Sequence, residues 1–206
     1  MASKKIDISL KKHAKQSRSI ATVDAMIEAS TYILTRHGPA GFTANKVAEK
    51  AGVNIGSFYQ YFPNKEALLF HIIKLNWEKQ LARIAPVLAR SGPDNAKKLR
   101  DFIREFFMVE AAEADLRRAV RIASIDLRDT PEFQELISKG TELTRDFLRT
   151  AVQVQGPEDL EFYVNFIVLM MTSFAERTTD EGTSGSELIR QADLLSDMLI
   201  AQFQIR

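Results

Sequence analysis

The chain has 206 residues and no cysteine; 45% of its residues are hydrophobic, 27% are charged, and its formal net charge is +1. This length allows one or two small domains, and the apolar content is sufficient for a folded core. The absence of cysteine excludes disulfides, thiolate metal sites and a cysteine nucleophile. Neither a secretory signal nor an apolar run of about 18 residues is found, so we expect a cytoplasmic protein without a membrane span.

The charge is unevenly distributed along the chain. Residues 1–65 contain ten Lys or Arg and four Asp or Glu, a net charge of +6, whereas the remaining residues carry a net charge of −5. A basic N-terminal part followed by an acidic body suggests that only the first part meets a polyanion. An incidental lysine-rich tail is the alternative.

The first part of the chain predicts three helices, over residues 17–37, 43–50 and 54–62. Gly38-Pro39 ends the first of them, and Gly52 ends the second. Thr43 and Asn54 are good N-caps for the second and third helices. Pro63 limits the third helix to two turns.

Longer helices are expected beyond residue 64. Apolar residues at helical spacing place them at about 64–85, 99–109, 116–127, 130–155, 160–175 and 187–204. Strand-like alternation is almost absent. The sequence therefore predicts an all-α fold of about nine helices.

A helix, a tight turn at Gly52 and a second short helix follow one another between Thr43 and Phe62. This is the layout of a helix-turn-helix, whose second helix enters the major groove of DNA. Gly56, near the start of that helix, has no side chain to prevent close approach to bases or phosphates. Phe58 and Phe62 are four residues apart, and we expect them to point the other way and hold the short helix to its neighbours.

The helix predicted over residues 54–62 and the residues just after it carry the kinds of side chain that read DNA. Amide and hydroxyl groups suit bases, an apolar group suits the thymine methyl, and phenol hydroxyls and an ammonium group suit phosphates. These groups belong to Ser57, Gln60, Ile55, Tyr59, Tyr61 and Lys65.

With these residues in place, the chain resembles the TetR-type (TetR/AcrR) transcriptional regulators over residues 18–68. The matching residues are Arg18, Ile20, Ala29, Gly38, Thr43, Val47, Ala48, Ala51, Gly52, Val53, Gly56, Ser57, Tyr59, Tyr61, Phe62, Lys65, Glu66 and Leu68. Asn54 stands where the family often has Ser, and Phe58 where it often has Leu. Both keep the physical role of the residue they replace, as a cap and as a core residue.

The resemblance implies a homodimeric repressor that binds a near-palindromic operator in double-stranded DNA and is released by a small lipophilic effector. It divides the chain into a basic arm (1–17), a helix-turn-helix domain (18–64) and an effector-binding and dimerisation domain (65–206). The residues that it implies face DNA are Thr43, Asn54, Ile55, Gly56, Ser57, Tyr59, Gln60, Tyr61 and Lys65.

Five lysines precede the first helix: Lys4, Lys5, Lys11, Lys12 and Lys15. One interpretation is an arm that follows the DNA backbone or enters the minor groove. A disordered solubilising tail is the other.

Two C-terminal segments, 160–175 and 187–204, are too apolar to be covered by one small domain alone. In the family resembled here, such helices form a four-helix contact, and a two-fold contact uses the same patch on each subunit. The predicted interface residues are Phe162, Phe166, Met170, Leu195, Met198 and Leu199. A core within one chain is the alternative.

Several aromatic residues of the middle helices are candidates for an apolar effector pocket, although a filled core is the simpler explanation for any single one of them. The candidates are Trp77, Phe106, Phe147 and Phe166. The arginines at 117, 118, 121 and 128 suit an anionic ligand or a solvated helix face.

No catalytic or metal-binding constellation is apparent. The three histidines, His13, His37 and His71, are far apart, and there is no P-loop and no Gly-x-Ser-x-Gly motif. We therefore expect neither an enzyme nor a cofactor. A DNA-binding protein without an effector and an all-α enzyme stay as alternatives.

Overall fold

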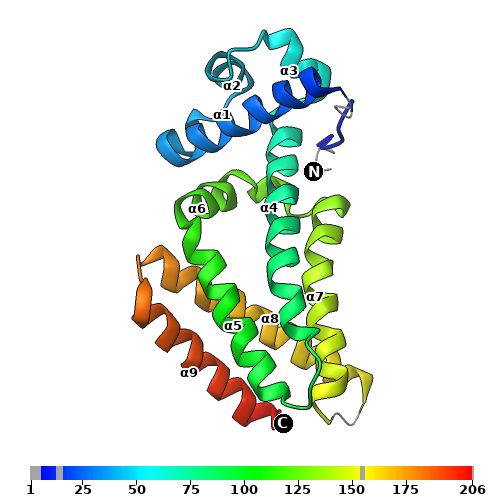
Figure 1. Cartoon of the computed structure of the whole chain (residues 1–206). Helices are drawn as coiled ribbons and strands as arrows, with labels where there is room; N and C mark the ends of the chain where they lie inside the picture. The colour runs from blue at the N-terminus through cyan, green and yellow to red at the C-terminus, as the bar shows by residue number, and fades with distance from the viewer. Residues whose placement is uncertain (1–5, 13–15, 154–155, 206) are drawn as a thin grey trace. The chain divides into compact units, whose positions relative to one another are not determined.

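The computed structural model describes residues 6–12, 16–153 and 156–205. Over these residues the chain forms nine α-helices and one 3-10 helix, without a strand, which confirms the all-α expectation (Figure 1). The helices are α1 (Ser17–Gly41), α2 (Ala44–Lys50), α3 (Ile55–Tyr61), α4 (Lys65–Leu88), α5 (Asn95–Ala112), α6 (Ala114–Ala123), η1 (Ile125–Leu127), α7 (Pro131–Ala151), α8 (Pro157–Asp180) and α9 (Gly185–Phe203).

The helix boundaries follow the predicted caps and breaks closely. Gly38 has φ +66° and kinks α1 at the position where the first helix was expected to end. Glycine adopts this left-handed conformation without a Cβ penalty, so the last turn, Pro39–Gly41, takes a new direction. The differences reach four or five residues: α5 begins at Asn95 instead of residue 99, α6 ends at Ala123 instead of 127, α7 ends at Ala151 instead of 155, and α8 continues to Asp180 instead of 175.

The chain divides into two packing units. The N-terminal unit contains residues 1–76 and 115–134, and the C-terminal unit contains residues 77–114 and 135–206. The chain crosses between them within α4, at the start of α6 and within α7. Thus α6, η1 and the first turn of α7 pack with the helix-turn-helix, and Leu116, Leu127 and Phe133 share its buried core.

In the C-terminal unit, α9 packs along α5, and α8 contacts both. Arg100 Nη2 lies 2.6 Å from Asp197 Oδ1, and Arg104 binds both carboxylate oxygens of Asp193. The hydrogen bonds from Arg104 lower the pKa of the Asp193 carboxyl group. These partly exposed ion pairs add little stability by themselves and lie beside the buried apolar residues through which α9 packs on α5.

None of the helices over the described residues is both long and apolar enough to cross a membrane.

Candidate nucleic-acid interface

The turn between α2 and α3 is built by two capping side chains and one glycine. Thr43 Oγ1 accepts a hydrogen bond from Lys46 N at 3.3 Å, which caps α2, and Asn54 Oδ1 accepts one from Gly56 N at 2.7 Å, which caps α3. Gly52 has φ +66°, a conformation that favours glycine in so tight a turn. The predicted helix-turn-helix geometry is therefore present in the N-terminal unit.

Helix α3 has seven residues and depends on packing to stay helical. Phe58 and Phe62 are fully buried, with ring centroids 5.9 Å apart, in the core that contains Val47 and Ala48 of α2. These residues point inward as expected. Removing a buried phenylalanine of this kind typically costs about 3–5 kcal/mol.

The opposite side of α3 is open to solvent. Ile55, Gly56 and Gln60 are exposed, Ser57 is half-buried, and 46% of Tyr59 is accessible. A Cβ added to Gly56 would lie 3.1 Å from Asn54 Oδ1, so the cap itself favours glycine there. The absence of a side chain at position 56 also lets the start of α3 approach bases or phosphates closely.

Tyr61 does not lie on this surface, contrary to the expectation that its hydroxyl faces DNA. Only 6% of Tyr61 is accessible, because it is three residues after Phe58 and therefore on the buried side of α3. Its side chain belongs to the core of the N-terminal unit.

Three of the predicted residues meet at one shallow hollow although they come from three elements. Thr43 before α2, Tyr59 on α3 and Lys65 at the start of α4 line a volume of about 370 Å³. Lys65 Nζ is 4.0 Å from Glu66 Oε1, and its side chain stays 44% accessible. A hydroxyl, a phenol and an ammonium group at one exposed place form a suitable binding site for a phosphate.

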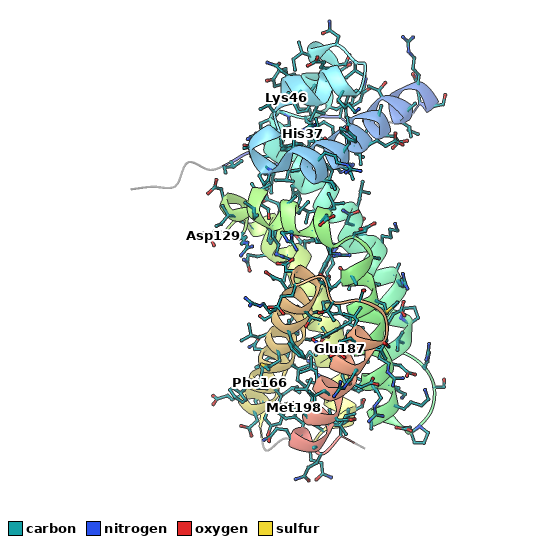
Figure 2. All side chains as sticks on the ribbon, turned by 90° about the vertical axis from the view of Figure 1, so that its left-hand side faces the viewer. His37, Lys46, Asp129, Phe166, Glu187 and Met198 are labelled. Carbon is teal, nitrogen blue, oxygen red and sulfur yellow. The ribbon has the colours of Figure 1, made fainter. Side chains whose placement is uncertain are left out.

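Two further lysines lie on α2. Lys46 is exposed (Figure 2), and the Lys50 ammonium group lies 3.9 Å from the centroid of the Tyr32 ring on α1. Of the five arm lysines, Lys4, Lys5 and Lys15 lie outside the described residues. Lys11 and Lys12 are exposed, in a segment that packs on this unit.

The predicted dimer residues divide into two groups. Phe162, with 63% accessible, and Met198, with 58%, are exposed, Phe166 is also exposed and Met170 is partly buried. Leu195 and Leu199 were expected at the interface, but both are buried in the core of their own unit, on the side of α9 that packs inward. On α8 and α9, the large exposed apolar residues that the predicted interface does not include are Leu169 and Leu194.

These exposed residues form two stripes at helical spacing, Phe162, Phe166 and Leu169 on α8 and Leu194 and Met198 on α9. Figure 2 shows Phe166 and Met198 on these two helices. The rings of Phe162 and Phe166 stack with centroids 6.1 Å apart, and Phe166 meets Phe203 of α9 edge-on at 6.0 Å. We call this surface the α8–α9 apolar face.

The four predicted pocket residues do not share one environment. Phe106 and Phe147 are buried in the core of the C-terminal unit, whereas Phe166 is on the α8–α9 apolar face and so does not line an internal pocket. Trp77 is half-buried and packs on α7, where a Cβ at Gly140 would lie 3.0 Å from its ring. Its indole Nε1 is buried and has no hydrogen-bond partner among the described residues.

Over the described residues, no group of three or more His, Asp or Glu side chains is arranged to hold a metal ion. His37 and His71 instead make aromatic contacts, with Tyr32 and Phe62 respectively. His13 lies outside the described residues.

Comparison with known proteins agrees with this geometry. Residues 26–72, which contain the whole helix-turn-helix, match the family model of the bacterial regulatory proteins of the tetR family. None of the curated proteins matches the sequence significantly.

Several solved structures share the fold at low sequence identity. The fatty acid degradation regulator FadR of Bacillus halodurans has a TM-score of 0.67 and 18% identity, with 94% of this chain and 100% of that chain covered. FadR of Bacillus subtilis, in complex with stearoyl-CoA, has a TM-score of 0.69 and 18% identity, covering 88% and 97%. SmeT, the repressor of a Stenotrophomonas maltophilia multidrug efflux pump, has a TM-score of 0.70 and 19% identity, covering 91% and 92%.

Proposed function

We propose that this chain, a TetR-family transcriptional regulator by its helix-turn-helix domain and its fold, is a homodimeric repressor that a small lipophilic molecule releases from DNA. The observation that carries the proposal is the solvent-exposed side of α3, whose residues do not pack in the core. Ile55, Gly56 and Tyr59 are exposed there, next to the hollow lined by Thr43 and Lys65. The proposed DNA contacts are the residues predicted from the sequence, except Tyr61.

A dimer follows from the α8–α9 apolar face. Several large exposed apolar residues on two helices that pack together mark an interaction site. A second copy of the chain offers the same face, and a two-fold axis then pairs the two patches and duplicates α3. Two copies of α3 suit an operator with two related half-sites.

We expect selection from a random duplex library to yield a near-palindromic sequence. The half-sites should lie about one helical turn of DNA apart, or a multiple of it, because each copy of α3 enters a major groove on the same side of the duplex. Sequencing of the bound fraction after several rounds measures this directly. Enrichment of a single site without inverted symmetry, or of none, would contradict the proposed mode of binding.

The surroundings of Trp77 support an effector site in the C-terminal unit. The indole Nε1 is a buried donor without a described acceptor, and such groups are rarely left unsatisfied. One turn further along α4, the buried Gln80 donates a hydrogen bond to Glu110 Oε1 of α5 at 2.9 Å. A hydrogen-bond acceptor on a lipophilic effector would satisfy the indole Nε1 of Trp77.

Trp77 is the only tryptophan, so its fluorescence reports on this place alone. We expect a ligand that releases the operator to change the emission of Trp77 over the same concentration range. Stearoyl-CoA, the ligand in the B. subtilis structure, is the first probe, followed by neutral drug-sized lipophilic compounds.

Release of the operator without any change in emission would place the effector elsewhere. If no compound releases the operator or changes the Trp77 emission, a DNA-binding protein without an effector is the better description. A Trp77→Phe variant is the control for optical artefacts, because it keeps the apolar ring and removes the signal.

The proposed signal uses α4, which begins beside the helix-turn-helix and continues into the C-terminal unit. A ligand that binds against Trp77 or Gln80 changes the preferred position of this helix and with it the spacing of the two copies of α3. The shift can be no larger than the difference in ligand affinity between the two states.

A further inference from the structure

The lysine-rich segment before α1 is packed where the structure describes it. Ile8 is only 4% accessible and belongs to the core of the N-terminal unit, and Ile6 and Leu10 pack against that core. Asp7 and Ser9, which alternate with them, are exposed. This period of two is that of an extended segment with one apolar side. We call residues 6–12 the strap.

The strap makes two hydrogen bonds to the C-terminal end of α3. Lys11 N donates to Tyr61 O at 3.0 Å, and Lys11 Nζ donates to Tyr59 O at 3.3 Å. The last four carbonyl groups of a helix have no partner within it, and in a seven-residue helix they are a large share of the total. Lys11 therefore caps α3 from 48 residues away in the sequence.

A third hydrogen bond ties the strap to the start of α4. Asn64 Nδ2 donates to Asp7 O at 2.8 Å, while Asn64 Oδ1 accepts from Ala67 N at 2.7 Å and so caps α4. One amide group thus joins the strap to the helix that follows α3. The strap is bound on both sides of the link between α3 and α4.

We propose that the strap holds α3 in the orientation from which it reads DNA, with Lys11 as the positioning residue. The inference rests on the proposed function of α3. It differs from the two interpretations of the arm, because it assigns the strap neither contact with phosphate nor mere solubility. Tyr59 links the two roles, since its carbonyl oxygen binds Lys11 and its side chain is exposed at the hollow.

A positioning role and a phosphate contact affect DNA binding differently. Loss of a phosphate contact weakens binding to all sequences by about the same factor and lowers the salt dependence. Loss of orientation weakens binding to the operator more than binding to unrelated DNA, because only the operator requires correctly placed side chains.

Lys11→Met and Lys12→Met form a matched pair for this test. Both lysines are exposed and each variant removes one charge, but Lys12 donates no hydrogen bond among the described residues. We expect Lys11→Met to reduce operator affinity by about 3- to 10-fold while affinity for unrelated DNA falls only as in Lys12→Met. Fluorescence anisotropy with labelled operator and labelled random duplex measures both affinities. Equal effects of the two variants on both duplexes would overturn the proposal.

Ile8→Ala tests the same proposal without removing a charge, because it loosens the strap and leaves every lysine in place. Hydrogen exchange of the peptide that covers 55–62 should become faster in the full-length variant, and the ratio of operator to random-duplex affinity should fall. Unchanged exchange would overturn the proposal, as would faster exchange with an unchanged affinity ratio. Selective binding by the parent chain tests the function of α3 independently of either variant.

Discussion

The Tyr59→Ala, Lys65→Ala double variant is expected to lose operator affinity by about 100-fold or more while it melts at nearly the same temperature as the parent. Tyr59 is 46% accessible and the Lys65 side chain 44% accessible, and neither belongs to a buried core, so their removal opens no cavity there. Each loss occurs twice in a dimer, and a hydrogen bond to a charged phosphate is worth about 1.5–3 kcal/mol. Anisotropy titration with the selected operator measures the loss.

The salt dependence provides a second readout of this variant. Removing one phosphate contact lowers the slope of log affinity against log salt concentration by about 1, so the loss of Lys65 in both subunits should lower it by about 2. Lys139→Ala is the control for the loss of one lysine charge, because Lys139 is an exposed residue of α7 outside the predicted contact set. A folded Tyr59, Lys65 variant that binds as tightly as the parent would contradict the proposed role of α3.

The helix-turn-helix could be predicted because its determinants are local. Asn54, Gly52 and Pro63 act within a few residues of their own position, and the helices begin and end close to them. The burial of Tyr61 was also predictable, since it is three residues from Phe58 on the same side of α3. Its hydroxyl group suggested a phosphate contact, but its position on the helix decides where it points.

The strap could be predicted only in part. The alternation of Ile6, Ile8 and Leu10 within the lysine-rich segment is the signal of an extended segment with a buried side. What it packs against depends on hydrogen bonds to residues about 50 positions later, such as Lys11 to Tyr61. No local pattern contains that information.

The inner side of α9 could not be assigned from the sequence. Apolar residues occupy both the 194/198 and the 195/199 positions, and these stripes are one residue apart on the helix. In the structure, Leu195 and Leu199 share the buried core with α5, and beside them Asp193 pairs with Arg104 of α5, which is 89 residues away. With this side held against α5, Leu195 is buried and Leu194 and Met198 are left exposed.

The exposed apolar residues of α8 and α9 predict a second large effect, on the association of two subunits. We expect the Leu169→Glu, Met198→Glu double variant to sediment with the chain mass of 23.3 kDa, whereas the parent sediments with twice that mass. Four carboxylates would lie in an apolar contact without partners, and burying unpaired charges costs several kcal/mol for each. Both side chains are exposed in the single chain, so the folded monomer should keep its helical circular dichroism spectrum.

The affinity for the operator should fall when the dimer is lost. A monomer contacts one half-site at a time, and the second α3 no longer binds as part of the same molecule, so the gain from a linked second site is lost. Met108→Glu, Ile137→Glu is the control, because both are exposed apolar residues of the same unit, 42% and 41% accessible, on α5 and α7. A control that dissociates, or a Leu169, Met198 variant that remains dimeric, would place the subunit contact elsewhere. A parent chain that is monomeric at micromolar concentration would remove the symmetric mode of DNA binding altogether.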